Sequence, residues 1–433
     1  MKSDIPTYNL KAVMRETGLS AGTLRAWERR YGLLQPLRTT GGHRLYTEQD
    51  IKLLKWLVAR QDEGLSISHA ITMWNNLEKA EQDQIQRPAD ARPMPAAEVS
   101  PATLNGLRRA WIEACLVFDE QAAEQMLAEA FAIASAEDVC IEILQKGLAE
   151  IGYGWYSGSI SVQQEHFASA LALRRLNALL TAASPPTRPG RILAALPPDE
   201  MHAFSLLMLS LLLRRRGFDV VYLGTNVPFS RLNETLALIK PRLILSAAQT
   251  LISAASLQAL AAFASAQGLP LAFGGGIFVQ IAGLAGRIPG HYLGSDLRTV
   301  TQQIERLLAN PAPPPKVKPM PAETAALREK FAAAMTQIDA TAARAMQSEG
   351  VELHLVETVQ TQFSRQILAA LTLGNIDYLD VFAGWLESFS QNHDLPPGLT
   401  ARYYAAYRQG VQEHLGSEAG PILDWFAKME DGD

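Results

Sequence analysis

The sequence has little cysteine and no long apolar run, and each absence excludes a class of protein. Its 433 residues contain only two cysteines, Cys115 and Cys140. Two isolated cysteines give no disulfide framework and no CxxC metal pair, so we expect a reducing, cytoplasmic environment in which any metal arrives inside a cofactor. The N-terminal MKSDIPTYNL lacks the apolar segment of a signal peptide. No apolar run reaches the ~18 residues typical of a membrane span, so no membrane partner is expected.

The chain as a whole is acidic, but its N-terminal part is basic. The net charge of −5 argues at first against nucleic acid. Residues 1–80, however, carry 12 Lys and Arg against 8 Asp and Glu, a balance of +4, and the remainder carries 27 against 36, a balance of −9. A basic head on an acidic body is typical of a nucleic-acid-binding protein.

Three proline-rich stretches, at 88–101, 184–190 and 310–321, punctuate the chain. Proline blocks helix continuation, so these stretches predict semi-rigid connections. Apolar spacing predicts helices in the first, second and last blocks, whereas short β-leaning runs alternate with helical patterns in the third, which favours a parallel sheet. The predicted fold class is multidomain α and α/β. The predicted parts are 1–85, a linker at 86–102, a helical bundle at 103–184, a sheet domain at 190–308, a linker at 309–322, and a helical domain at 323–433.

The basic head predicts a helix-turn-helix followed by a wing. Gly18 suits the tight turn and Ser20 is a good N-cap for the second helix. Arg25 and Arg29 then share one helix face, where they could reach phosphates or guanine edges. A Gly-Gly turn flanked by arginines suits a β-hairpin over the DNA backbone. On the helix pair alone, an ordinary helical hairpin with solvated arginines is an equal alternative.

The stretch TLRAWERRYGLL at 23–34, followed by RTTGGHRLYT at 38–47, resembles the MerR-type winged helix-turn-helix. The resemblance implies that Trp27 and Tyr31 are core residues and that the protein binds pseudo-palindromic double-stranded DNA operators as a homo-oligomer. The residues that it implies for DNA binding are Thr23, Arg25, Arg29, Arg38, His43, Arg44 and Tyr46.

His202 lies in the loop after the first predicted strand of the sheet domain. A lone histidine is usually an ordinary surface or core residue, but open α/β sheets bind ligands at this edge. There an imidazole can ligate a metal while Glu200 or Asp199 orients its ring. Ser246 ends a later strand and Gly274-Gly275-Gly276 follows the next, where glycine lets a backbone approach a ligand closely.

This ordered set resembles the cobalamin-binding Rossmann-like module of B12 proteins. The resemblance implies that His202 is the lower axial ligand of cobalt, with Glu200 beside it. It also implies that Ser246, Gly274, Gly275 and Gly276 line the slot for the nucleotide tail. Ser205 stands where the motif has glycine.

Within the second block, Trp155 is followed nine residues later by Glu165-His166. Taken alone, the tryptophan suits a core position and the Glu-His pair a solvated helix face. The spacing resembles that of light-sensing MerR regulators that use adenosylcobalamin. It implies a four-helix bundle that caps the corrin, with Trp155, Glu165 and His166 around the adenosyl group. The histidine that follows the tryptophan in those regulators, where it becomes a cobalt ligand after photolysis, is Tyr156 here.

These observations together predict a cytoplasmic DNA-binding transcriptional regulator and photoreceptor that uses adenosylcobalamin and changes its oligomeric state and DNA binding when light cleaves the Co–C bond. Alternatives are a light-independent cobalamin sensor and a MerR repressor with a vestigial B12 fold. An enzyme is not expected, because the sequence shows no eightfold βα pattern for a substrate barrel. The helices of 323–433 suit oligomerisation or capping, or else a second pocket for a bilin near His354, His393 or His414.

Overall fold

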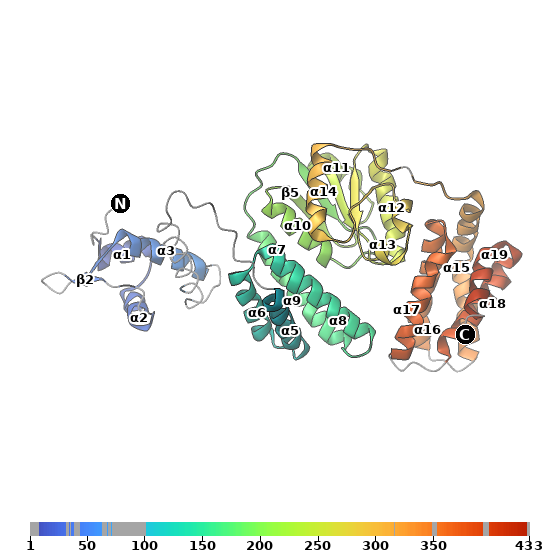
Figure 1. Cartoon of the computed structure of the whole chain (residues 1–433), viewed down its shortest axis with the longest axis horizontal. Helices are drawn as coiled ribbons and strands as arrows, with labels where there is room; N and C mark the ends of the chain where they lie inside the picture. The colour runs from blue at the N-terminus through green and yellow to red at the C-terminus, as the bar shows by residue number, and fades with distance from the viewer. Residues whose placement is uncertain are drawn as a thin grey trace. The chain divides into compact units, whose positions relative to one another are not determined.

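The computed structural model describes residues 8–31, 34, 36–38, 44–62, 67, 71, 101–315, 317–348, 353–392 and 398–430. The chain divides into two compact units, Met1–Glu98 and Val99–Asp433 (Figure 1). Among the described residues, no helix is long and apolar enough to cross a membrane.

The first unit combines short helices with a three-stranded antiparallel sheet in the order β1-β3-β2. Its elements are β1 (Tyr8–Asn9), α1 (Leu10–Thr17), α2 (Ala21–Tyr31), β2 (Leu37–Arg38), β3 (Arg44–Tyr46) and α3 (Glu48–Asp62). This is the predicted winged helix-turn-helix.

Local chemistry sets the turn between α1 and α2. Gly18 ends α1 in the left-handed region with φ of 72°, which costs a glycine little. The Thr23 backbone N–H donates to Ser20 Oγ at 3.0 Å, so Ser20 caps α2 as predicted. Trp27 is buried against Leu24 and Leu54, which confirms its expected core position.

The second unit begins with a helical bundle. Its elements are α5 (Pro101–Leu116), α6 (Glu120–Ile133), α7 (Ala136–Val139), the π-helix η1 (Cys140–Gln145), α8 (Lys146–Tyr156) and α9 (Val162–Thr181). Because α7, η1 and α8 follow one another without a break, the bundle has four helical rods. We call this bundle the cap.

A five-stranded parallel sheet follows, in the order β5-β4-β6-β7-β8. Its strands are β4 (Arg191–Ala195), β5 (Asp219–Gly224), β6 (Pro241–Ala247), β7 (Leu271–Gly274) and β8 (His291–Tyr292). Its helices are α10 (Phe204–Arg215), α11 (Leu232–Ile239), α12 (Leu251–Ala266), α13 (Ile277–Gln280), η2 (Leu284–Arg287) and α14 (Leu297–Ala309). We call this α/β part the module.

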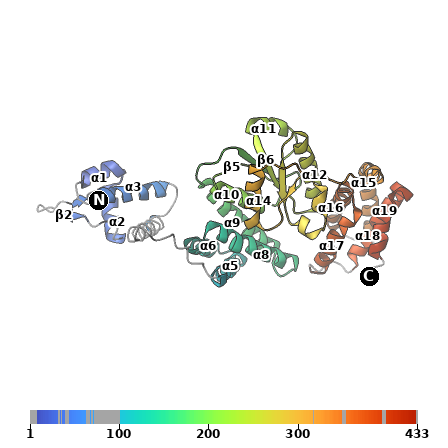
Figure 2. The ribbon, with the colours of Figure 1, turned by 45° about the horizontal axis from the view of Figure 1, so that its top comes forward.

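The module has an apolar core on each face of its sheet. One core joins the strands to α10 and α14 through side chains such as Leu209 and Ile304. The other joins them to α11 and α12. Leu207 and Leu211 on the outer side of α10 belong to the core of the cap, so the cap packs on that side of the module (Figure 2).

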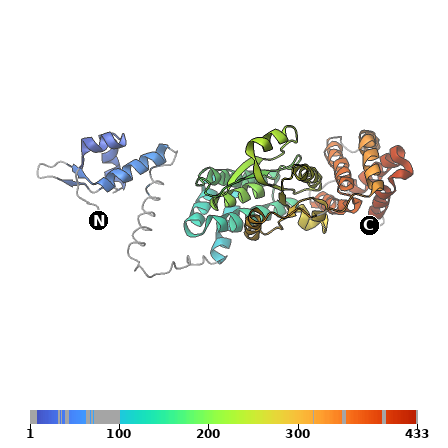
Figure 3. The ribbon, with the colours of Figure 1, turned by 90° about the horizontal axis from the view of Figure 1, so that it is seen from above.

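The chain ends in a second helical bundle, which we call the C-terminal bundle. Its elements are α15 (Ala322–Ser348), α16 (Leu353–Thr372), η3 (Ile376–Leu379), α17 (Asp380–Asn392), α18 (Leu399–Leu415), η4 (Gly416–Ala419) and α19 (Gly420–Glu430). Phe363 is fully buried at the centre of aromatic side chains that include Tyr407 and Phe426. The apolar core of this bundle is continuous with that of α12, so the bundle packs on the opposite side of the module from the cap (Figure 3).

Candidate functional site

The loop between β4 and α10 positions the predicted axial histidine at the carboxyl edge of the sheet. His202 Nδ1 lies 2.6 Å from Glu200 Oε1, and the His202 backbone N–H donates to the same oxygen at 2.8 Å. With Nδ1 engaged, Nε2 is the ring nitrogen left for a metal, and 63% of the imidazole is exposed. Of the two acidic residues that sequence analysis offered for orienting the ring, Glu200 fills the role and Asp199 does not.

Glu200 is a fully buried carboxylate whose oxygens are all engaged. Its Oε2 accepts from the Gln249 backbone N–H at 2.6 Å and from Ser253 Oγ at 2.7 Å. Burial alone would raise the pKa of Glu200, but hydrogen bonds from His202 and Ser253 hold that pKa below its usual value. The carboxylate therefore stays charged and orients the imidazole rigidly.

Glu165 at the start of α9 contributes to the field at His202. The hydrogen bond to Glu200 raises the pKa of His202 despite burial, and the charge of Glu165 raises this pKa further. Glu165 also accepts from Ser169 Oγ at 2.6 Å and lies 2.8 Å from the Nδ1 of the exposed His166. Glu165 of the cap therefore lies close enough to His202 for its charge to act on the imidazole, whereas His166 contacts Glu165 and is exposed.

Trp155 occupies the last turn of α8 and is partly buried. The chain then turns at 157–161, where the N–H groups of Ser159 and Ile160 donate to the Gly154 carbonyl. A Cβ on Gly154 would lie 2.4 Å from the Ile160 side chain, so this turn is tightly packed. Ser161 then caps α9 together with Gln164 in a capping box, which fixes the entry of Glu165.

A cavity of about 230 Å³ opens beside β6 and β7. Its lining comes from α10, the strand ends, α14 and one residue of the cap, and consists of Gln145, Ser205, Leu206, Leu209, Leu245, Ser246, Ala247, Gln249, Gly274, Gly275, Gly276, Leu293, Gly294, Ser295, Leu297 and Val300. Ser246 and the three predicted glycines therefore share one cavity. Gln145, which ends the π-helix of the cap, was not predicted, because neither its type nor its spacing marks it out.

The residues around this cavity leave room and polarity for a ligand. The Ser246 hydroxyl is buried without a hydrogen-bond partner. Gly275 has φ of +126°, and a Cβ there would lie 1.9 Å from the Ala248 carbonyl oxygen. The Gly276 N–H donates to Gln249 Oε1 at 2.8 Å. Gln249 lines this cavity and also donates its backbone N–H to Glu200, so the cavity lies beside the oriented imidazole. A cavity with an unpartnered buried hydroxyl at this place fits a corrinoid whose nucleotide tail enters the module.

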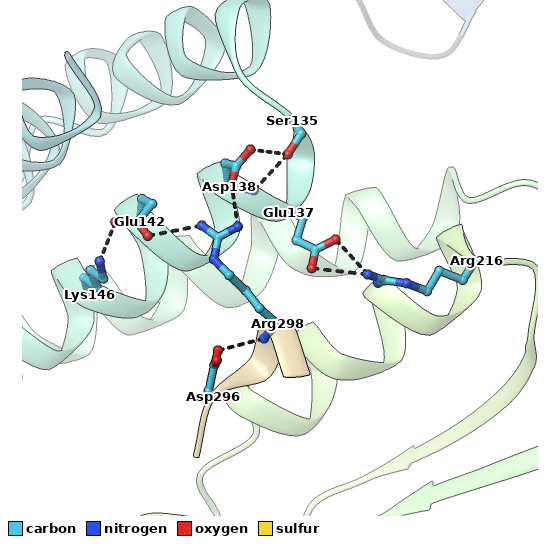
Figure 4. A network of polar contacts seen from close by, with 8 residues as sticks. All are labelled: Ser135, Glu137, Asp138, Glu142, Lys146, Arg216, Asp296 and Arg298. Atoms are coloured by element: carbon cyan, nitrogen blue, oxygen red, sulfur yellow. Dashed lines mark hydrogen bonds and ion pairs between the residues drawn. The ribbon is translucent and has the colours of Figure 1, made fainter. Parts of the chain in front are cut away.

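Ion pairs join the cap to the module (Figure 4). Arg298 of α14 reaches Asp138 at 2.8 Å and Glu142 at 3.2 Å, and Arg216 reaches Glu137 at 3.1 Å. Hydrogen bonds from Ser135 and Arg298 keep the pKa of Asp138 low. Sequence analysis missed these pairs, since their partners lie far apart in the chain.

The first unit corrects one predicted DNA contact. Tyr46 is fully buried, and its hydroxyl donates to Glu28 at 2.9 Å, so it is a core residue and does not face DNA. Burial and the neighbouring carboxylate raise its pKa to about 12. Arg44 is partly exposed and donates to Glu28 at 3.1 Å.

Thr23 lies near the surface beside Ser20 and, like Arg44, stays a predicted DNA contact. His43 and the side chains of Arg25, Arg29, Arg38 and Tyr31 lie outside what the structure describes. So do His393 and the side chain of His354, whereas His414 lies 3.0 Å from Thr341 Oγ1 in the C-terminal bundle.

Comparison with known proteins finds family matches in the first unit and in the cap. A family model of MerR HTH regulatory proteins matches residues 8–77, and a B12 binding domain model matches residues 107–180 of the cap. The HTH-type transcriptional repressor CarH of Myxococcus xanthus is 34% identical over 236 residues, which are 54% of this chain and 76% of CarH. CarA of the same organism is 30% identical over 241 residues, 55% of this chain and 75% of CarA.

A monomethylamine corrinoid protein of Methanosarcina barkeri is loosely similar in structure, with a TM-score of 0.42 and 16% identity over 48% of this chain and 100% of that one.

Fold, site and sequence relatives thus define a MerR-type helix-turn-helix regulator with a B12 binding domain. More particularly, the chain belongs to the family of B12-binding transcriptional regulators that includes CarH and CarA.

Proposed function

We propose that this protein is a transcriptional regulator whose DNA binding is controlled by adenosylcobalamin and by light, and that it is not an enzyme. The observation that carries the proposal is the His202–Glu200 pair, which lies beside the cavity of Ser246 and within the electrostatic reach of Glu165 from the cap. A cofactor shifts a conformational equilibrium only if it binds the two states with different affinity. Contacts with both the cap and the module would give it that difference.

Each part would hold a different portion of the cofactor. His202 would bind cobalt through Nε2 while Glu200 fixes the ring. Ser246 would donate to or accept from the nucleotide tail, and the three glycines would let the backbone approach it. Glu165 would accept from the ribose hydroxyls of the adenosyl group, with Trp155 supplying an apolar face. When bound, adenosylcobalamin supplies a cobalt–carbon bond that light can break.

The ion pairs of Arg298 and Arg216 give the cap a second, salt-sensitive attachment to the module. If the contacts of Glu165 and Trp155 with the adenosyl group were lost, these ion pairs would keep the cap near the module. The cap would then shift relative to the module without leaving it. In a homo-oligomer, that shift would change the affinity for DNA, because an oligomer that loses the contact of one DNA-binding unit loses avidity.

Absorbance spectroscopy of the protein loaded with adenosylcobalamin, before and after illumination, tests the proposal. We expect illumination to change the absorbance spectrum of the bound cofactor. We also expect it to change the binding of the protein to its own promoter DNA in a gel-shift assay. A spectrum that changes while DNA binding does not would contradict control by light.

A light-independent cobalamin sensor is the second candidate, and Tyr156 is the observation that favours it. The side chain that follows Trp155 is a phenol, which is a weaker ligand for cobalt than imidazole would be. Equal DNA binding in darkness and light, combined with dependence on cobalamin concentration, would support this candidate.

A further inference from the structure

The C-terminal bundle makes polar contacts with the His202 loop of the module and with the end of α8 in the cap. Arg365 of α16 pairs with Asp199 of the module at 2.5 Å. Asn392 at the end of α17 donates from Nδ2 to the Tyr156 carbonyl of the cap at 3.0 Å. Asp199 is adjacent to Glu200, and Tyr156 is adjacent to Trp155. One bundle therefore contacts both segments that carry the predicted cofactor ligands.

Asp199 lies in the loop between β4 and α10 that presents His202, and its backbone is unusual. Its φ is 68°, in the left-handed region that a non-glycine residue adopts only when its surroundings hold it there. The Asp199 N–H donates to Asn226 Oδ1 at 3.0 Å, and the Asn226 N–H donates to the Glu200 carbonyl at 3.0 Å. Ser256 Oγ approaches the carboxylate at 3.4 Å. Arg365 is the charged partner among these contacts.

Arg365 is presented by a rigid support. Its neighbours Ser364, Gln366 and Ile367 are buried, and α16 packs on α12 of the module. The Arg365 side chain is 35% exposed, so its attraction to Asp199 is partly screened. The ion pair between Arg365 and Asp199 therefore matters more for the position of the loop than for the free energy of unfolding.

The contact with the cap is equally close. Gly158 has φ of +76°, and a Cβ on it would lie 2.4 Å from the Asn392 carbonyl oxygen. Any larger residue at 158 would push the two segments apart. The bundle thus spans the division between the cap and the module.

We propose that Arg365 is a positioning residue of the cobalamin site, which acts through Asp199 on the loop that carries Glu200 and His202. The C-terminal bundle then supports the cofactor site from outside it. This inference rests on the proposed role of His202 as the cobalt ligand. It assigns to residues 323–433 a role in cofactor binding that is separate from the roles of the DNA-binding unit and the cap.

The test measures cobalamin binding to full-length protein by absorbance, which reports both affinity and whether histidine is coordinated to cobalt. For Arg365→Gln we expect cobalamin affinity to fall by about threefold to tenfold, with a smaller histidine-coordinated fraction at saturation. Arg365→Lys should restore part of both, because it keeps the charge. Arg328→Gln, which removes an arginine paired with Glu329 on its own helix α15, serves as the matched control.

A second readout needs no cofactor. In the apo protein, hydrogen exchange of residues 199–203 should be faster in Arg365→Gln than in wild type. Asp199→Asn should reproduce the loss, and the double variant should be no weaker than the worse single variant, as expected for two residues acting through one contact.

The outcomes separate this inference from the proposed function. If His202→Ala abolishes histidine coordination but Arg365→Gln changes neither affinity, spectrum nor exchange, Arg365 has no positioning role. If His202→Ala leaves the spectrum unchanged, the proposed cobalt ligand is wrong and the inference fails with it.

Discussion

At the scale of single residues, the site depends on one buried carboxylate. Glu200 accepts four hydrogen bonds, two from His202 and one each from Gln249 and Ser253, so it fixes the histidine and joins the loop to α12. A buried acceptor of this kind is costly to replace, because its donors lose their partners.

Glu200→Gln is expected to weaken cobalamin binding by about tenfold to 100-fold, as is usual for the partner of a metal-bound histidine. The amide has only one acceptor oxygen, so at least one donor at this position loses its partner. Titration followed by absorbance measures the effect. Glu234→Gln, an exposed ion-pair residue of the same module, is the control and should bind as wild type does. Equal affinities for the two variants would refute the role of Glu200.

Tyr46 decides between a core residue and a DNA contact. Removal of its hydroxyl in Tyr46→Phe leaves Glu28 without one partner, so we expect the first unit to lose about 1–2 kcal/mol of unfolding free energy. Urea unfolding measures this loss. A variant of unchanged stability that binds DNA more weakly would restore the original sequence-based interpretation.

The sequence allowed prediction of the residues whose roles follow from local spacing. Gly18, Ser20 and Trp27 were assigned correctly because turns, caps and helical cores have short-range patterns. Tyr46 was assigned wrongly because the family resemblance gave a role that burial against α2 overrides. The contact of Arg365 with Asp199 joins residues far apart in the chain, and no local pattern marks such a pair.

At the scale of elements, the cap and the module are joined by apolar packing on α10 and by ion pairs around Arg298. Helical spacing predicted the helices of the cap, and the alternation of helical patterns with short apolar runs predicted the parallel sheet, but neither predicted this junction. Carboxylates of the cap meet arginines of the module, and the complementarity is evident only once the two are folded together.

Arg298→Ala should weaken this junction in a pH-dependent way. The pKa values of Asp138 and Glu142 are lowered in the folded protein, so the stability that these groups contribute is present above their unfolded pKa values and is lost as the pH falls through the lowered ones. We expect a loss of about 1 kcal/mol near pH 7 after allowance for solvent screening. That difference should shrink below about pH 4.

Thermal unfolding of wild type and Arg298→Ala across this pH range is the measurement. Arg306→Ala, two turns further along α14, is the matched control. A difference between wild type and Arg298→Ala that stays constant with pH would show that the carboxylates are not the partners that matter.

Gly275→Ala tests the loop after β7. The added Cβ would meet the Ala248 backbone at 1.9 Å, and φ of +126° is itself unfavourable for alanine. We expect a destabilisation of about 3 kcal/mol or more. Gly268→Ala, which also has positive φ but meets nothing within 4 Å, should lose only about 1 kcal/mol. Chemical denaturation compares them, and similar losses in both would show that close backbone approach does not matter.

At the scale of the whole molecule, the parts have separate tasks. The first unit has the fold of a DNA-binding domain, and the second holds the cap, the module and the C-terminal bundle. The apolar core of the module continues into the C-terminal bundle, so these residues are an integral part of the second unit. Their helical character was predictable from the sequence, whereas their contact with the cofactor loops required the three-dimensional structure.

The central claim is that cobalamin held by His202 controls DNA binding. Its most direct test is the affinity for promoter DNA of four samples of full-length protein: apo, loaded in darkness, loaded and illuminated, and His202→Ala with the same cofactor. The account predicts that the dark loaded sample differs in affinity from the apo and illuminated samples, and that the His202→Ala sample matches the apo protein. Equal affinity in all four samples, with wild-type cobalamin loading confirmed by absorbance, would contradict it.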